Sequence, residues 1–242
     1  ADVSELYTVG FVSPSGEVIE RLPLAVGQET TVSFQLDATH IFISYQITEA
    51  SSGRFLAFLR FTAPAPGIWH IRVYPTLFVA GQFHIWLPMQ GFLTEDTGFL
   101  RPDPDITITD PGNAPLLLTV STYNHVTGSL YIHSSRGFTA TGQIKPDFAA
   151  PGVEVQGPGI PPGTSRLSRQ TGSSVATAIT AGAVACLFSW GFTQGNDTTL
   201  TSISVKSILI RGAERKEAFR YPNRQWGYGT LNLYQAFLLM RE

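Results

Sequence analysis

The hydrophobic pattern changes near residue 100, and this change constrains the fold more than any other feature of the sequence. Upstream, apolar and polar residues alternate, as at Val32, Phe34 and Leu36 and again at residues 69–73 and 83–87. A period of two is typical of half-buried antiparallel strands. Clusters of Pro, Ser and Gly separate these segments and predict turns. We therefore predict an all-β sandwich of jelly-roll type for the first part of the chain.

The second part of the chain has a different hydrophobic pattern. It begins after the segment RPDPD at residues 101–105, whose two prolines suit a connection on the surface and exclude a central strand. A continuous apolar run at residues 116–120 predicts a strand covered on both faces, and residues 130–133 predict another. Three helical patterns follow, at about residues 174–191, 202–212 and 233–241. Strands followed by helices indicate an α/β layer architecture. We place the domain boundary between residues 102 and 103, so that the domains are 1–102 and 103–242.

Composition excludes several classes of protein. The 242 residues include 16 basic and 18 acidic side chains, so no basic face is indicated and nucleic acid is not an expected partner. The single cysteine, Cys186, excludes an internal disulfide and a cysteine-rich zinc site, and we expect it to be a small buried hydrophobe. Trp69 and Trp86 are expected to lie in the core or an interface. The apolar stretch at residues 175–190 contains Thr and Ser and is too short for a bilayer, so no membrane partner is expected.

The most informative stretch is TGSSVATAITAG at residues 171–182. Ser174 lies where a glycine-containing loop meets a long apolar helical pattern, and a helix amino terminus offers free backbone N–H groups that can stabilise an oxyanion. Gly172 allows a tight turn and room for a substrate carbonyl. Spacing alone favours a simpler interpretation, in which Ser173 or Ser174 is an ordinary N-cap of a core helix, and that alternative stays open at this point.

Four motifs in order resemble the subtilase family of serine proteases. GSSVA at residues 172–176, followed by Gly182, is similar to the nucleophile motif, although Ser173 stands where Thr is usual and Ala178 where Pro is usual. The other three are DPGNA at residues 110–114, KPDFAAPG at residues 145–152, and GYGTLN at residues 227–232 followed by Ala236. Together the motifs cover residues 105–242.

The resemblance implies a role for each matching residue. The fold would be a partial α/β subtilisin-like domain with a parallel sheet and helices, next to the jelly roll. The implied catalytic nucleophile is Ser174, and the implied substrate-binding residues are Asp110, Pro111, Gly112, Gly172 and Ser173. No metal is required; calcium is common among similar proteins, but no cluster of ligands is evident here.

The family presents its triad in the order Asp, His, Ser, and neither the Asp nor the His motif is present. None of the five histidines has the expected setting, and His70 and His84 alternate with apolar residues, which predicts solvated positions. We interpret Asp147 as a carboxylate that structures a loop. The oxyanion asparagine is also missing. A lone serine is a poor nucleophile, so this chain by itself is predicted to be almost inactive.

Three functions remain in competition. The first is a serine endopeptidase fragment that acts on peptides or proteins and needs an amino-terminal fragment of the same protein for Asp and His. The second is an inactive subtilase-fold pseudoprotease with a binding or regulatory role. The third, a carbohydrate-binding jelly roll with an unrelated tail, is opposed by the four motifs. GIW at residues 67–69 and HIWLP at residues 84–88 resemble clostridial germination-type subtilases, a resemblance compatible with secretion or association with spores.

Overall fold

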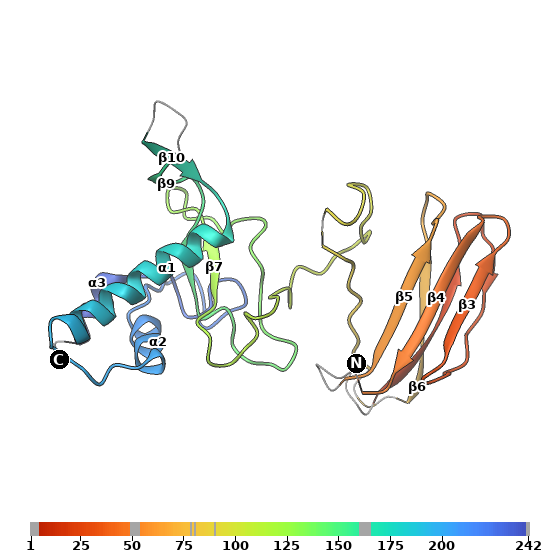
Figure 1. Cartoon of the computed structure of the whole chain (residues 1–242), viewed down its shortest axis with the longest axis horizontal. Coiled ribbons are helices and arrows are strands. Elements are labelled where there is room, and N and C mark those ends of the chain that lie inside the picture. Colours follow the sequence, from red (N-terminus) through yellow and green to blue (C-terminus); the bar gives the residue numbers. More distant parts are fainter. Residues whose placement is uncertain are drawn as a thin grey trace. The chain divides into compact units, whose positions relative to one another are not determined.

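The computed structural model describes residues 5–48, 54–77, 79, 81–89, 91–159 and 166–240. The chain forms two compact units, Ala1–Gly98 and Phe99–Glu242. Figure 1 labels most of the strands and all three α-helices.

The first unit consists of two antiparallel sheets. Its strands are β1 (Leu6–Val12), β2 (Val18–Ile19), β3 (Glu29–Phe34), β4 (Thr39–Gln46), β5 (Leu56–Thr62) and β6 (His70–Leu77). The strand orders are β2-β1-β6 and β3-β4-β5. Val9 pairs with Val73 in one sheet, and Ile43 pairs with Leu59 in the other.

Alternation along β4 shows why these residues form a sheet. Ile41, Ile43 and Tyr45 are buried, the residues between them are half-buried, and His40 and Gln46 on either side are exposed. β-branched and aromatic side chains fit such a half-buried, pleated surface. The buried residues of β4 share one core with those of β1, and burying each large side chain contributes about 1.5–3 kcal/mol.

The two tryptophans expected to lie in the core or an interface have different surroundings. Trp69 packs against the core, with its ring edge-on to Phe34 at 5.0 Å and to Phe61 at 5.4 Å between centroids. Trp86 is exposed, because its segment has no ladder partner among the described residues.

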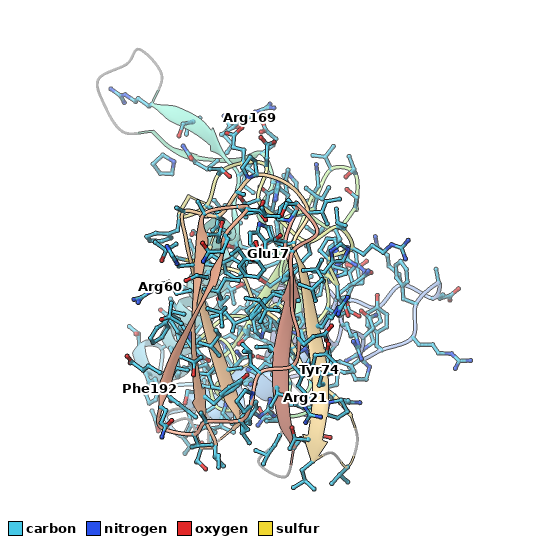
Figure 2. All side chains as sticks on the ribbon, turned by 90° about the vertical axis from the view of Figure 1, so that its right-hand side faces the viewer. Glu17, Arg21, Arg60, Tyr74, Arg169 and Phe192 are labelled. Carbon is cyan, nitrogen blue, oxygen red and sulfur yellow. The ribbon has the colours of Figure 1, made fainter. Side chains whose placement is uncertain are left out.

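Arginines cover aromatic rings on the outer surface of this unit. The Arg60 guanidinium lies 4.7 Å from the centre of the Phe42 ring, and that of Arg21 lies 5.9 Å from the centre of the Tyr74 ring (Figure 2). Such contacts are worth about 0.5–1 kcal/mol at exposed sites.

Four of the predicted strand segments differ in the structure. Of residues 116–120, only Val120 belongs to a strand, and Leu116 and Leu117 are exposed, because the chain turns before that strand begins. β3 ends at Phe34, and Leu36 lies exposed in the tight turn before β4. Residues 83–87 form no strand, although Phe83 contacts Tyr7 with 5.5 Å between ring centroids. Residues 130–133 contain only an isolated bridge at Leu130, because the chain turns there. Both histidines predicted to be solvated, at positions 70 and 84, are indeed exposed.

The second unit combines short strands with helices. Its elements are β7 (Val120–Tyr123), β8 (Phe148–Pro151), β9 (Val155–Pro158), β10 (Leu167–Gln170), α1 (Ser173–Phe188), the π-helical turn η1 (Ser189–Thr193), α2 (Ser202–Arg211) and α3 (Leu233–Leu238). β7 and β8 are parallel, whereas β9 and β10 form an antiparallel hairpin. Phe148, Leu187, Leu209 and Ala236 are fully buried in the core of this unit.

Helix α1 has two different faces. Ala176, Thr180, Ala183 and Leu187 are buried, and the helix packs on β7 and β8 (Figure 1). The opposite side is exposed and made of small residues, Cys186 among them. The predicted burial of Cys186 is therefore wrong: the helix is apolar all round, but only one side of it is covered by described residues.

With η1, the helix extends over 21 residues, Ser173–Thr193, and by length and composition it could cross a membrane. The prediction that this stretch is too short and too polar is therefore not supported. Because the core helix of a soluble protein meets the same criterion, the observation is weak evidence for a membrane span.

Candidate active site

Ser174 lies exposed in the first turn of α1. The N-cap is Gly172, and no side chain caps the helix, so the N-cap alternative for Ser173 and Ser174 is wrong. In the part of the chain that the structure describes, no hydrogen-bond partner is found for Ser174 Oγ. The Val175 and Ala176 N–H groups donate to the Gly172 carbonyl at 3.1 and 3.4 Å, whereas the Ser173 and Ser174 N–H groups have no acceptor among the described residues. A free hydroxyl therefore lies beside free donors at the positive end of a 16-residue helix.

The turn before Ser174 is fixed to the carboxyl ends of two parallel strands. The Gly172 N–H donates to the Gly152 carbonyl at 2.8 Å, just after β8 ends. A Cβ on Gly152 would lie 2.5 Å from Thr122 Cγ2 of β7 and 3.1 Å from Ala176 Cβ of α1. The carboxyl ends of β7 and β8 and the start of α1 therefore pack together at Gly152, with no room for a side chain there. In open α/β sheets, ligands bind at this carboxyl edge.

Asp110, Pro111 and Gly112 form a turn held by its own neighbours. Asn113 Nδ2 donates to the Ile108 carbonyl at 2.8 Å, and the Gly112 N–H donates to Thr109 at 2.8 Å. Asp110 and Pro111 are exposed and Gly112 is half-buried. Among the described residues, no hydrogen bond joins this turn to the nucleophile turn.

Asp147 lies away from the nucleophile and is buried between two lysines. Its carboxylate contacts Lys145 Nζ at 3.0 Å and Lys206 Nζ at 2.9 Å. It also accepts the Thr119 N–H at 2.8 Å. The interpretation of Asp147 as a structural carboxylate agrees with these contacts.

The histidines give Ser174 no base in this structure. All five, at positions 40, 70, 84, 125 and 133, are exposed, and none is found to hydrogen-bond to Ser174. Within the described ranges, no three His, Cys, Asp or Glu side chains come together as a metal site.

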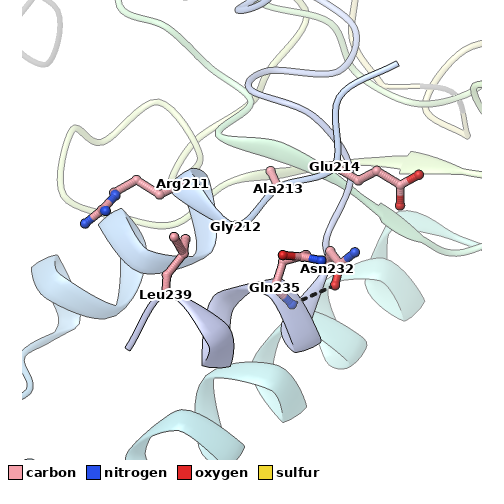
Figure 3. A pocket seen from close by; sticks show the side chains of 7 residues that line it. All are labelled: Arg211, Gly212, Ala213, Glu214, Asn232, Gln235 and Leu239. Carbon is pink, nitrogen blue, oxygen red and sulfur yellow. Dashed lines mark hydrogen bonds between the residues drawn. The ribbon is translucent and has the colours of Figure 1, made fainter. Parts of the chain in front are cut away.

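Two cavities lie elsewhere in the second unit. One, of about 380 Å³, opens between the end of α2 and α3 and is lined by residues that include Arg211, Asn232 and Leu239 (Figure 3). The other, of about 570 Å³, is lined by residues that include Asp105 and Arg224. Neither is lined by Ser174.

Comparison with known proteins identifies the family. The model of the subtilase family, peptidase S8, matches residues 101–229. The chain belongs to the subtilase family. The match contains the nucleophile turn and the turn at residues 110–112, and it excludes all strands of the first unit. The family resemblance inferred from the sequence motifs is therefore confirmed.

Individual relatives support this membership. The subtilase chain is 34% identical over 113 residues to the membrane-bound transcription factor site-1 proteases of Mus musculus and Rattus norvegicus, covering 44% of this chain and 10% of each relative. The structure of the Clostridium perfringens CspB protease matches 100% of this chain with a TM-score of 0.88 and 26% identity. This chain spans 50% of the CspB chain. The likeness establishes a subtilisin-like fold.

Sequence reasoning about this subtilase missed three residues that shape the site. Gly152 was part of a recognised motif but had no assigned role, and Thr119 and Lys206 were not singled out. The lack of space at Gly152 results from contacts with β7 and α1, and only the folded structure shows it. For Thr119 and Lys206 the sequence contains no comparable signal.

Proposed function

We propose that this chain is the nucleophile-bearing part of a serine endopeptidase. The observation that carries the proposal is the exposed, uncapped Ser174 hydroxyl at the start of α1. A serine whose hydroxyl is not engaged in capping is available for attack. The family membership and the location of the turn at the strand ends support the same conclusion.

The missing base would come from an upstream segment of the same protein. That segment would supply Asp, His and the oxyanion Asn. The uncovered face of α1 supports this idea, because Ala178, Ala181 and Gly182 allow another backbone to approach closely. The length of the CspB chain, twice the span matched here, is compatible with such a segment.

In the proposed reaction, Ser174 Oγ attacks the carbonyl carbon of a peptide bond while the upstream histidine takes the hydroxyl proton. The Ser174 N–H stabilises the oxyanion, and Gly172 and Ser173 border the bound peptide. The histidine then protonates the leaving amine, and water releases the acyl group from Ser174. Asp110, Pro111 and Gly112 would form a wall of the pocket for the residue before the scissile bond.

The first unit would be a jelly-roll sandwich inserted in the subtilase domain. Two facing antiparallel sheets with one shared core support this assignment.

A pseudoprotease is the second candidate, since no histidine among the described residues reaches Ser174. Such a protein would bind peptides or partners without cleaving them. Its site would keep the fold and lack the proton acceptor.

Labelling with an alkyl fluorophosphonate separates the two candidates. The protein that includes the upstream sequence should be labelled at Ser174, and Ser174→Ala should abolish labelling. Ser189→Ala is the matched control, because it removes an exposed hydroxyl at the other end of the same helix and should leave labelling intact. A longer protein that carries the upstream sequence and remains unlabelled would establish the pseudoprotease.

A further inference from the structure

The side-chain ammonium groups of Lys145 and Lys206 contact the same residues in and beside the loop that leads into β7. Lys145 Nζ donates to the Leu117 carbonyl, to Thr119 Oγ1 at 3.1 Å and to Asp147 Oδ2 at 3.0 Å. Lys206 Nζ, from α2, donates to the Pro115 carbonyl at 3.1 Å.

Lys206 Nζ also donates to the Leu117 carbonyl and to Asp147 Oδ1, each at 2.9 Å. Each ammonium group therefore uses all three of its N–H donors, and Leu117 accepts from both. Lys145 and Asp147 are almost completely buried, and the Lys206 side chain is 17% exposed.

This cluster connects directly to the turn at residues 110–112. The Thr119 hydroxyl accepts from Lys145 Nζ and donates to the Gly112 carbonyl at 2.7 Å. A Cβ added to Gly112 would lie 3.3 Å from Thr119 Cγ2, so there is little free space between the two residues. The hydroxyl thus couples a buried charge to the position of Gly112.

We propose that Lys145 and Lys206 are positioning residues for the Gly112 carbonyl in the substrate-pocket wall. Lys145 acts directly through the Thr119 hydroxyl, whereas Lys206 acts through the Asp147 carboxylate and the Leu117 carbonyl, which both lysines contact. The role of that wall rests on the proposed function, but the anchoring itself does not. Three elements distant in sequence, the segment 115–119, the entry to β8 and α2, hold the turn in place.

The positive charge is what this arrangement requires. A neutral isostere at position 206 would leave the Pro115 carbonyl without its lysine donor and the Leu117 carbonyl with Lys145 alone, and the buried Asp147 would lose a counter-ion. Burial lowers the pKa of the Lys145 ammonium, and the nearby Asp147 carboxylate opposes this shift. Hydrogen bonds to charged groups are stronger than neutral ones, so loss of one should loosen the turn measurably.

Amide hydrogen exchange tests the anchoring without any need for activity. In the protein that includes the upstream sequence, Lys206→Met and Thr119→Val should each accelerate exchange of the Gly112 and Thr119 amides by about tenfold. Propylammonium should restore slow exchange in Lys206→Ala, because the truncated site is partly exposed. Thr193→Val, at the end of η1, is the matched control: its exposed side chain makes no hydrogen bond among the described residues, and it should leave the exchange of residues 110–119 unchanged. Unchanged exchange in both test variants, or an equal change throughout the second unit, would overturn the proposal.

Kinetics then tests the consequence for the substrate. Lys206→Met should raise KM by about tenfold for a peptide with a large side chain before the scissile bond. The KM for a peptide with Gly at that position, and the rate of labelling of Ser174 by a small fluorophosphonate, should stay unchanged. If exchange responds but the wild-type protein is never labelled, the anchoring stands and the protease proposal fails. If labelling occurs and both peptides respond equally, the role in specificity is wrong.

Discussion

Gly172 donates its backbone N–H to the carbonyl of Gly152 at 2.8 Å, and this bond joins the nucleophile turn to the end of β8. The glycine at position 152 is needed because three neighbours leave no room for a side chain. Its Cβ would lie 2.5 Å from Thr122 Cγ2 and 2.8 Å from the Gly172 carbonyl oxygen. The position of Ser174 therefore depends on a residue 22 positions upstream.

Gly152→Ala should destabilise the second unit by about 1–3 kcal/mol, because the added methyl group overpacks this junction. Denaturant unfolding of the chain measures the effect. Gly157→Ala, in β9, is the control: no atom lies within 4 Å of its added Cβ, and stability should change by less than about 0.5 kcal/mol. Equal stability of the two variants would show that the junction is not tightly packed.

Thr122→Val should stabilise the chain by about 1 kcal/mol, because the buried Thr122 Oγ1 has no hydrogen-bond partner among the described residues. Thermal or urea unfolding provides the measurement. Thr39→Val should have the opposite effect and lower the free energy of unfolding by about 1–3 kcal/mol. There the hydroxyl donates to the Ala63 carbonyl at 3.0 Å and accepts the Ala65 N–H at 3.0 Å. A loss of stability in Thr122→Val would mean that its hydroxyl has a partner.

Alkaline pH should weaken the first unit through Tyr45. Burial raises the pKa of this phenol above its ordinary value of 10.0, although the Val9 N–H that its oxygen accepts at 3.2 Å opposes the shift. Because the folded pKa exceeds the unfolded one, the contribution to stability is complete below pH 10.0 and is lost as the pH rises through the folded pKa. Urea unfolding followed by Trp69 fluorescence, from about pH 8 to about pH 11, should show this decline.

Tyr45→Phe should make that pH dependence shallower. Tyr7 would still contribute in the variant, because burial raises its pKa too, as does the nearby Glu5 carboxylate. A profile as steep as that of the wild type would mean that Tyr45 does not titrate on unfolding.

Local patterns predicted the elements well where one face meets a core, as in β6 and α1. They failed where the outcome depends on distant partners. The segment at residues 83–87 alternates like a strand but finds no ladder partner among the described residues, and Cys186 lies on a helix side that no described residue covers. The nucleophile turn was predictable because Gly172 and Ser174 are neighbours in sequence. The link from Lys145 to Gly112 was not, because Thr119 joins them across 26 and 7 residues.

The exposed face of α1 supports a last prediction about the upstream segment. Ala181 lies on this face and Ala183 on the buried one. Ala181→Asp should therefore cost the chain only about 0.7 kcal/mol, the difference in helix propensity. Ala183→Asp should cost several times more, about 2–7 kcal/mol, because it buries a polar group.

In the protein that includes the upstream sequence, Ala181→Asp should reduce fluorophosphonate labelling of Ser174 by at least about tenfold, because a carboxylate would be trapped where another backbone approaches. A separate variant, Ala181→Ser, is the control for charge. Its hydroxyl is small and uncharged, so the upstream segment should still fit and labelling of Ser174 should persist. Wild-type labelling in Ala181→Asp would mean that the upstream segment leaves this face of α1 open, and the histidine would then have to reach Ser174 from the side of β7.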